Sequence, residues 1–263
     1  MTIFQAIILG LVQGITEFLP ISSSGHLLIF PEVLHWPLQD YDFDVTIHLA
    51  TLLAVIWVLR LEVKNILLGL FKKNNKFGQL GWKIALATIP AVILGLVVSQ
   101  HIDAVRTTQL VAINLIIWGV VLWIADIYET RLKTSLSKVE LLGWQQTFLT
   151  GCAQAIALIP GTSRSGITMS AGMFLGLNRE TAARFSFLLG IPAILGAGAL
   201  TFFDALENGL STPIPALVAG FITAFLFGVI AIKFLLKFLV KSNFRYFALY
   251  RILLGISLLI FLV

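Results

Sequence analysis

Charged side chains are scarce in this sequence of 263 residues, since Asp, Glu, Lys and Arg make up 12% of it and hydrophobic residues 58%. A soluble domain has about 25% charged residues, so this chain lacks much of the surface that keeps a protein in water. An exterior this apolar must contact lipid, which excludes a soluble enzyme and a disordered chain. Cysteine is nearly absent too: Cys152 stands alone, which excludes an internal disulfide and a thiolate metal cluster.

Long apolar runs take the place of the missing charge. A helix that crosses a membrane needs about 20 mostly apolar residues. The sequence therefore predicts an all-α polytopic membrane protein, with residues 1–263 forming a single integral membrane domain. The six predicted transmembrane helices lie at 45–59, 84–102, 107–125, 185–203, 208–232 and 246–263.

Basic residues collect in the loops 60–83 and 233–245, the loop 126–140 is mixed with three basic residues, and the net charge is +5. Cytoplasmic loops of membrane proteins carry an excess of Lys and Arg. This rule puts the three loops in the cytoplasm and both termini outside. It also explains the positive charge without nucleic acid, so we expect no nucleic-acid partner.

Two further apolar regions, 1–30 and 141–177, are interrupted near their middles by proline, glycine and serine. The loop assignment requires each region to begin and end on one side of the membrane. We therefore predict two re-entrant helical hairpins that enter from opposite faces.

The two hairpins share a sequence pattern. Adding 141 to the residue numbers aligns 10–25 with 151–166, and six of the sixteen aligned positions are identical. Three predicted spans separate the copies, so the second copy is inverted. The chain is thus predicted to be an inverted-topology repeat, with repeat 1 at about 1–130 and repeat 2 at about 141–263, a plan that forms binding sites near the membrane midplane.

The first hairpin carries ionisable residues at membrane depth. Gln13 and Glu17 are four residues apart and so share one face of a helix, which Pro20 must end. An ionisable residue inside a membrane segment is costly and usually functional. A cluster of small polar residues and a histidine then opens the next helix, whose N-terminus suits an anion: Ser22, Ser23, Ser24, Gly25 and His26.

The second hairpin repeats this pattern with an arginine inside it, at Arg164. Its planar guanidinium suits a phosphate group, although it would also neutralise Glu17 as a buried pair. We favour the phosphate. The neighbouring hydroxyl residues are Ser163, Ser165 and Thr168.

These residue types together predict a phosphoryl-transfer site. Arginine and free N–H groups stabilise the charge of the transition state, while a serine hydroxyl or the imidazole attacks phosphorus. Glu17, with Gln13 beside it, is suited to hold a divalent cation or to act as a base. A site open to lipid implies a substrate with a diphosphate head and a prenyl tail.

Other polar residues receive structural interpretations. We expect His35, His48 and His101 to be ordinary helix histidines, Asp42 and Asp44 to be solvated loop charges, and Arg251 to reach the membrane interface or to pair with a lipid headgroup.

The two motifs resemble those of the bacterial undecaprenyl-diphosphatase family, also called bacitracin-resistance proteins. Residues 13–26 match (Glu or Gln)-x-x-x-Glu followed by Pro-x-Ser-Ser-(Ser or Thr)-Gly-His, and residues 160–168 match Pro-Gly-x-Ser-Arg-Ser-x-x-Thr. Weaker similarity covers almost the whole chain.

The resemblance implies hydrolysis of undecaprenyl diphosphate to undecaprenyl phosphate and inorganic phosphate. This reaction recycles the lipid carrier for cell-wall synthesis and gives resistance to bacitracin. The resemblance also implies Mg²⁺ or Ca²⁺ as a cofactor, and a location in the bacterial inner membrane with the site open toward the periplasmic or outer face. A homodimer is compatible with it.

Site residues follow from the same resemblance. Glu17 is the essential carboxylate and a candidate metal ligand, and Arg164 binds the phosphate. Ser23 is the candidate nucleophile, and His26 is the catalytic histidine, as nucleophile or proton shuttle. Gln13 replaces the second glutamate of some members, which removes one metal-binding carboxylate. The substrate-binding set is Gln13, Ser22, Ser24, Ser163, Ser165 and Thr168.

The main alternative is a lipid-phosphate carrier, because inverted repeats with re-entrant hairpins also describe secondary transporters. A carrier needs the arginine and the helix termini but no nucleophile. The pairing of Ser23 with His26 therefore favours the hydrolase. A structural membrane protein would leave Glu17 and Arg164 without a purpose.

Overall fold

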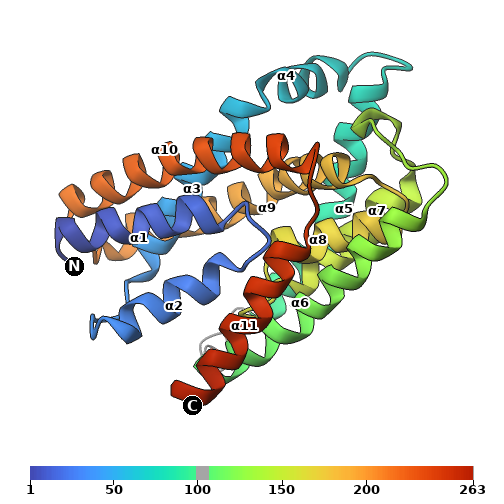
Figure 1. The fold of residues 1–263 in the computed structure, drawn as a ribbon. Helices are drawn as coiled ribbons and strands as arrows, with labels where there is room; N and C mark the ends of the chain where they lie inside the picture. The colour runs from blue at the N-terminus through green and yellow to red at the C-terminus, as the bar shows by residue number, and fades with distance from the viewer. Residues whose placement is uncertain (99–106, 263) are drawn as a thin grey trace.

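The computed structural model describes residues 1–98 and 107–262, and within these ranges helices and loops form the fold (Figure 1). This confirms the predicted all-α class. Residues 99–102 of the second predicted span, and His101 with them, lie outside the described residues. The helices are α1 (Ile3–Thr16), α2 (Ser23–Val33), α3 (Tyr41–Val58), α4 (Arg60–Gly69), α5 (Lys76–Val98), α6 (Thr108–Arg131), the short 3-10 helix η3 (Val139–Leu141), α7 (Trp144–Ile156), α8 (Arg164–Phe174), α9 (Arg179–Asn208), α10 (Ile214–Leu239) and α11 (Arg245–Phe261).

Five helices of the described chain, α3, α5, α6, α9 and α10, are long and apolar enough to cross a membrane. They correspond to five of the six predicted spans. The sixth corresponds to α11, whose 17 residues make it shorter than these five. Several helix boundaries differ from the predicted ones, because helices such as α5 (Lys76–Val98) and α9 (Arg179–Asn208) continue into charged residues that the predicted spans excluded, and the start of α10 differs for another reason. Gly209, at φ 79°, ends α9, and α10 begins only after Pro213, so the span predicted from 208 starts at Ile214.

The outer face of α10 shows why the chain needs lipid. Large apolar side chains recur there at every fourth position, which places them in one stripe along the helix. Each of the six is more than 50% exposed, a surface that water would not tolerate. They are Ile214, Val218, Ile222, Leu226, Ile230 and Phe234.

The two predicted hairpins are helical pairs that break at equivalent residues. α1 ends at Thr16 and α2 follows Ser22, whereas α7 ends at Ile156 and α8 follows Ser163. Both serines have positive φ, 73° and 71°. Each hydroxyl accepts a hydrogen bond from the backbone N–H three residues later, as helix N-caps do. Residues 141 apart thus share one unusual conformation, as the predicted repeat requires; the repeat itself and the entry of the hairpins from opposite faces stay predictions.

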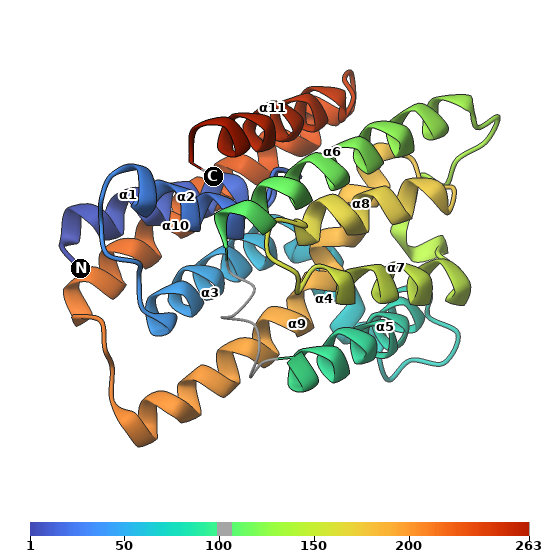
Figure 2. The same cartoon turned by 90° about the horizontal axis from the view of Figure 1, so that it is seen from below.

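Helix packing follows the same duplication. α1 lies along α10 and α7 lies along α5, while α6 and α11 pair with each other (Figures 1 and 2). The first hairpin (α1–α2) and the second hairpin (α7–α8) are therefore each supported by a long apolar helix from the other predicted repeat.

The start of α11 is anchored by an ion-pair network. The buried carboxylate of Asp126, on α6, accepts hydrogen bonds from Arg179 Nε at 2.7 Å, from Arg245 Nε at 3.0 Å and from the Phe244 N–H at 2.9 Å. The network fixes α11 against α6 and α9.

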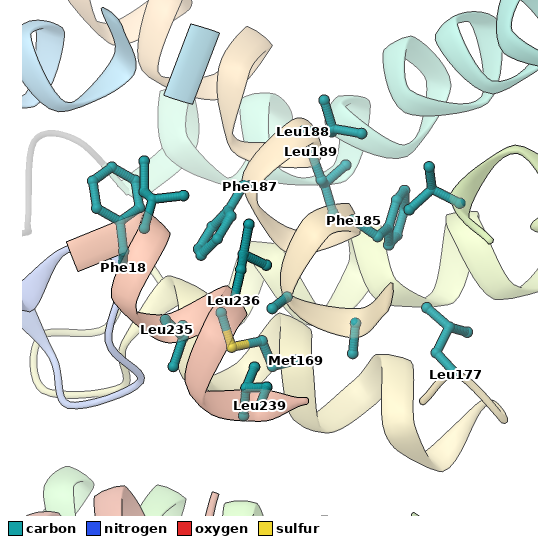
Figure 3. Packing of buried hydrophobic residues seen from close by; sticks show 14 of the residues in the cluster. Phe18, Met169, Leu177, Phe185, Phe187, Leu188, Leu189, Leu235, Leu236 and Leu239 are labelled. Atoms are coloured by element: carbon teal, nitrogen blue, oxygen red, sulfur yellow. The ribbon is translucent and has the colours of Figure 1, made fainter. Parts of the chain in front are cut away.

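The main hydrophobic cluster reaches the tip of the first hairpin (Figure 3). Phe18 is fully buried and packs edge-to-face on Phe187 of α9, with 5.3 Å between the ring centroids. Such a pair contributes about 0.5–1.5 kcal/mol beyond its buried area. It holds the residue next to Glu17 in one place.

Candidate active site

Glu17 is the centre of the site. It follows the last residue of α1 and its side chain is only 5% exposed. Oε1 accepts a hydrogen bond from Arg164 Nη2 at 2.6 Å, and Oε2 accepts one from the Ser23 hydroxyl at 2.6 Å and one from Gln13 Nε2 at 3.1 Å. Four of the sequence-predicted residues therefore meet, and they come from both hairpins.

Arg164 reaches Glu17 past a glycine of α9. Its Nη1 donates to the Ser186 carbonyl at 3.3 Å. A Cβ atom at Gly190 would collide with the guanidinium group, so glycine is needed for this close approach. α9 thus fixes the direction of the arginine.

Ser23 and Arg164 occupy equivalent positions in the two hairpins, because 23 plus 141 is 164, and each is the first residue of its helix. Both side chains contact Glu17, so the N-termini of α2 and α8 meet at the same carboxylate. The first N–H groups of a helix have no partner within the helix and carry partial positive charge. Two such termini and a guanidinium favour an anion with several oxygen atoms.

The four remaining serines of the predicted set lie at the tips of the two hairpins. Ser22 Oγ lies 3.4 Å from Ser24 Oγ, and Ser163 Oγ lies 3.3 Å from Ser165 Oγ. The Ser165 hydroxyl donates to the Leu19 carbonyl at 3.2 Å, which joins the second hairpin to the first.

Thr168 supports Arg164 from the next helical turn. Its hydroxyl donates to the Arg164 carbonyl at 2.7 Å and lies 2.7 Å from the Ser186 hydroxyl. It is thus bound to the backbone of the arginine and to the helix that directs its guanidinium.

His26 is buried and its two ring nitrogens have partners other than Glu17. Nδ1 lies 2.7 Å from the Ser22 carbonyl, and Nε2 lies 2.8 Å from the Tyr250 hydroxyl of α11. A histidine held in this way does not act as the base for Ser23 in this arrangement. Glu17 is the group in contact with that hydroxyl.

The sequence interpretation missed His48. Its Nε2 lies 3.6 Å from Glu17 Oε2, and its Nδ1 lies 2.7 Å from the Asp44 carbonyl. His48 is therefore at the edge of the site rather than an ordinary helix histidine. Its spacing along α3 gave no sign of this, because the contact with Glu17 joins two different helices.

Arg251 was also misinterpreted, since it neither reaches the membrane interface nor meets a lipid headgroup. It is fully buried; Nη1 donates to the Pro20 carbonyl at 3.3 Å, and Nη2 donates to the carbonyls of Gly161 at 3.1 Å and Thr162 at 2.7 Å. Arg251 thus connects the tips of both hairpins. The rule that identified Glu17, a charge within an apolar helix, applies to it equally.

Two predicted solvated aspartates have protein partners instead. Asp42 accepts hydrogen bonds from the N–H and the hydroxyl of Thr212, at 2.8 and 2.6 Å. Asp44 is buried and accepts one from Gln39 at 2.9 Å.

The donor set around Glu17 bears on the divalent cation. Within the described residues there is no group of three or more His, Cys, Asp or Glu side chains that would hold a metal alone. Mg²⁺, however, is often bound by one or two carboxylates together with substrate phosphates. Gln13 Oε1 is buried and lacks a hydrogen-bond partner among the described residues, and it belongs to the amide that bonds Glu17. A carboxylate and a free amide oxygen fit such a cation.

Fold and site together define a class: a polytopic membrane protein in which two broken helical segments bring hydroxyls, a carboxylate and a guanidinium together. Residues 6–257 match the family model described as "Bacitracin resistance protein BacA". The chain belongs to this family, as the resemblance of its motifs predicted.

Curated relatives agree over the full length. The chain is 42% identical to Undecaprenyl-diphosphatase 1 of Pseudoalteromonas translucida (strain TAC 125), with 100% of this chain and 99% of the relative covered. It is 41% identical to Undecaprenyl-diphosphatase 2 of Stutzerimonas stutzeri (strain A1501), with 99% and 98% covered. It is 43% identical to an undecaprenyl-diphosphatase of Alteromonas mediterranea, with 99% of each covered.

Proposed function

We propose that this protein is a membrane phosphatase that hydrolyses undecaprenyl diphosphate to undecaprenyl phosphate and inorganic phosphate, and thereby confers resistance to bacitracin. The observation that carries the proposal is the convergence of Ser23 and Arg164 on Glu17, each at 2.6 Å, from two hairpins far apart in sequence. The family and the names of its relatives support the same activity.

In the proposed reaction Ser23 is the nucleophile. Glu17 accepts the proton of the Ser23 hydroxyl as Oγ attacks the terminal phosphorus, and undecaprenyl phosphate leaves as the bond to the bridging oxygen breaks. Water then attacks the phosphoserine and releases inorganic phosphate, and the Ser23 oxygen regains a proton. This order agrees with the contact between Ser23 and Glu17 and with the engagement of both His26 nitrogens elsewhere.

Arg164 and the two helix N-termini bind the phosphate oxygens. In the absence of substrate the guanidinium is paired with Glu17, which keeps a buried charge compensated. When a phosphate binds, the guanidinium would donate hydrogen bonds both to Glu17 and to the phosphate, which its planar fork of N–H groups allows. The arginine then stabilises the charge that develops on the transferred group.

We also propose that Glu17 and Gln13 hold a divalent cation, Mg²⁺ or Ca²⁺, when substrate is bound. Such an ion would offset the negative charge of the diphosphate. Location in the inner membrane, a site open to the periplasmic or outer face, both termini outside and a homodimer are further proposals, which rest on the charge of the loops and on the family resemblance.

The test is phosphate release from a polyprenyl diphosphate by the purified protein in detergent, with added Mg²⁺ or Ca²⁺ and with a chelator. We expect release that the chelator reduces. Rapid quenching followed by mass spectrometry should find the phosphate on Ser23, and phosphate on His26 would overturn its assignment as nucleophile. No release with any divalent cation would contradict the phosphatase and favour the carrier.

A further inference from the structure

His26 has a defined tautomer in this site. A backbone carbonyl only accepts hydrogen bonds, so the 2.7 Å contact between His26 Nδ1 and the Ser22 carbonyl places the proton on Nδ1. In the neutral ring Nε2 then carries the lone pair. The hydroxyl of Tyr250, 2.8 Å from Nε2, is therefore the donor. The two rings are nearly parallel, with 8° between their planes and 5.8 Å between their centroids.

The helix that carries this hydroxyl is fixed relative to both hairpins. Arg251, the next residue, is fully buried and donates to the Pro20 carbonyl in the first hairpin and to the Gly161 and Thr162 carbonyls in the second. Hydrogen bonds from a charged group are stronger than those between neutral groups. Tyr250 therefore cannot move far unless the tips move with it.

We propose that Tyr250 is a positioning residue for His26. Its hydroxyl donates to Nε2 and so holds the ring in the orientation in which Nδ1 donates to the Ser22 carbonyl, next to the Ser23 residue whose hydroxyl contacts Glu17. Without the hydroxyl the ring keeps its hydrogen bond to Ser22 but gains freedom to rotate, and the tautomer with the proton on Nε2 becomes accessible whenever that hydrogen bond opens. The role in turnover rests on the proposed phosphatase function, whereas the effect on the tautomer does not.

The first test is nuclear magnetic resonance of the protein labelled with ¹⁵N-histidine in detergent, with the His26→Gln spectrum used to assign the signal. At a pH where the ring is neutral, we expect the wild-type His26 signal to show the proton on Nδ1. Tyr250→Phe should shift the Nε2 signal and populate the second tautomer. The matched control is Tyr246→Phe, the same change one turn earlier on α11, where the side chain is 64% exposed.

The second test separates kcat from KM. Tyr250→Phe should lower kcat about 10-fold to 100-fold, because the backbone next to the nucleophile Ser23 loses part of its positioning, and change KM less than about 2-fold. Adding Tyr250→Phe to His26→Gln should cause no further loss, because the tyrosine acts through the histidine.

Several results would overturn the proposal. These are a wild-type His26 signal with the proton on Nε2, an unchanged tautomer in Tyr250→Phe, a rise in KM alone, or losses that multiply in the double variant. The wild-type spectrum keeps the proposal testable even when a variant fails to fold. A protein without phosphatase activity but with the expected tautomer shift would refute the proposed function and leave the positioning by Tyr250 intact.

Discussion

The two hairpins have the same backbone geometry where they break but carry different side chains at equivalent positions. Each breaks before a serine with positive φ whose hydroxyl caps the following helix. At the equivalent positions, however, Glu17 in the first hairpin corresponds to Leu158 in the second, and His26 corresponds to Ile167. Each hairpin thus supplies a helix N-terminus that suits an anion, while the two hairpins supply different reactive groups.

The glutamines at the equivalent positions 13 and 154 show the consequence. Gln13 donates to Glu17, whereas Gln154 is buried with neither amide atom hydrogen-bonded among the described residues. The second hairpin lacks an acid for its glutamine to contact. The molecule therefore has one site assembled from two unequal halves, and the following predictions test that division.

The largest expected effect comes from the acid that only the first hairpin has. Glu17→Gln should lower kcat/KM on the order of 1,000-fold, because it removes the base in contact with Ser23 and the charge that compensates Arg164. Phosphate release by the purified variant measures the loss. Glu32→Gln, at an exposed carboxylate bonded to Thr108, is the control and should keep activity. Near-wild-type turnover by Glu17→Gln would remove Glu17 from the mechanism.

The second-largest loss of activity should come from changing Arg164, the group that the second hairpin contributes to the site. Arg164→Lys keeps the charge but loses the fork that contacts Glu17 and a phosphate together, so kcat/KM should fall about 100-fold. Arg184→Lys, which alters an arginine paired with Glu62 and Glu180, should leave kinetics unchanged. Equal losses in both variants would indicate a general effect on folding.

A smaller effect should follow from displacing the arginine without changing it. A methyl group at Gly190 would collide with the Arg164 guanidinium, whereas a Cβ at Gly196 of the same helix meets no atom within 4 Å. Gly190→Ala should therefore lower kcat/KM about 10-fold, since misplaced groups lose much of their effect. Gly196→Ala should be neutral in the same assay. The idea that α9 directs Arg164 fails if the two alanine variants have the same activity.

The smallest expected effect comes from the serine N-caps that both hairpins share. Ser163→Ala removes the hydroxyl that accepts from the Gly166 N–H, and Ser22→Ala removes the one that accepts from Gly25. Each should lower the free energy of unfolding by about 1 kcal/mol. Thermal unfolding in detergent measures both. A difference of several degrees between the two variants would show that the caps are not equivalent.

Local patterns in the sequence predicted most of the fold. Helix lengths, loop charges and the breaks at Pro20 and Pro160 all depend on neighbouring residues, which is why the hairpins were predicted. The start of α10 was wrong because Gly209 and Pro213 together insert a connection that hydropathy does not reveal.

The site residues that lie in the two motifs were predictable, whereas the residues that reach the site from other helices were not. Glu17, Ser23 and Arg164 lie in the two motifs, and they meet in the structure. His48 and Tyr250 reach the site from α3 and α11, through contacts with residues far away in sequence. Periodicity along one helix says which face is polar but not which helix that face contacts.

The central claim is that the acid of the first hairpin and the arginine of the second act on one headgroup. A double-mutant cycle on phosphate release tests it most directly, with Glu17→Gln, Arg164→Lys and the two combined. Groups that act as a unit give non-additive losses, so the combined variant should be no more than about threefold worse than Glu17→Gln alone. Losses that multiply, to about 100,000-fold from the single effects expected above, would mean that the residues act independently and would contradict a shared site.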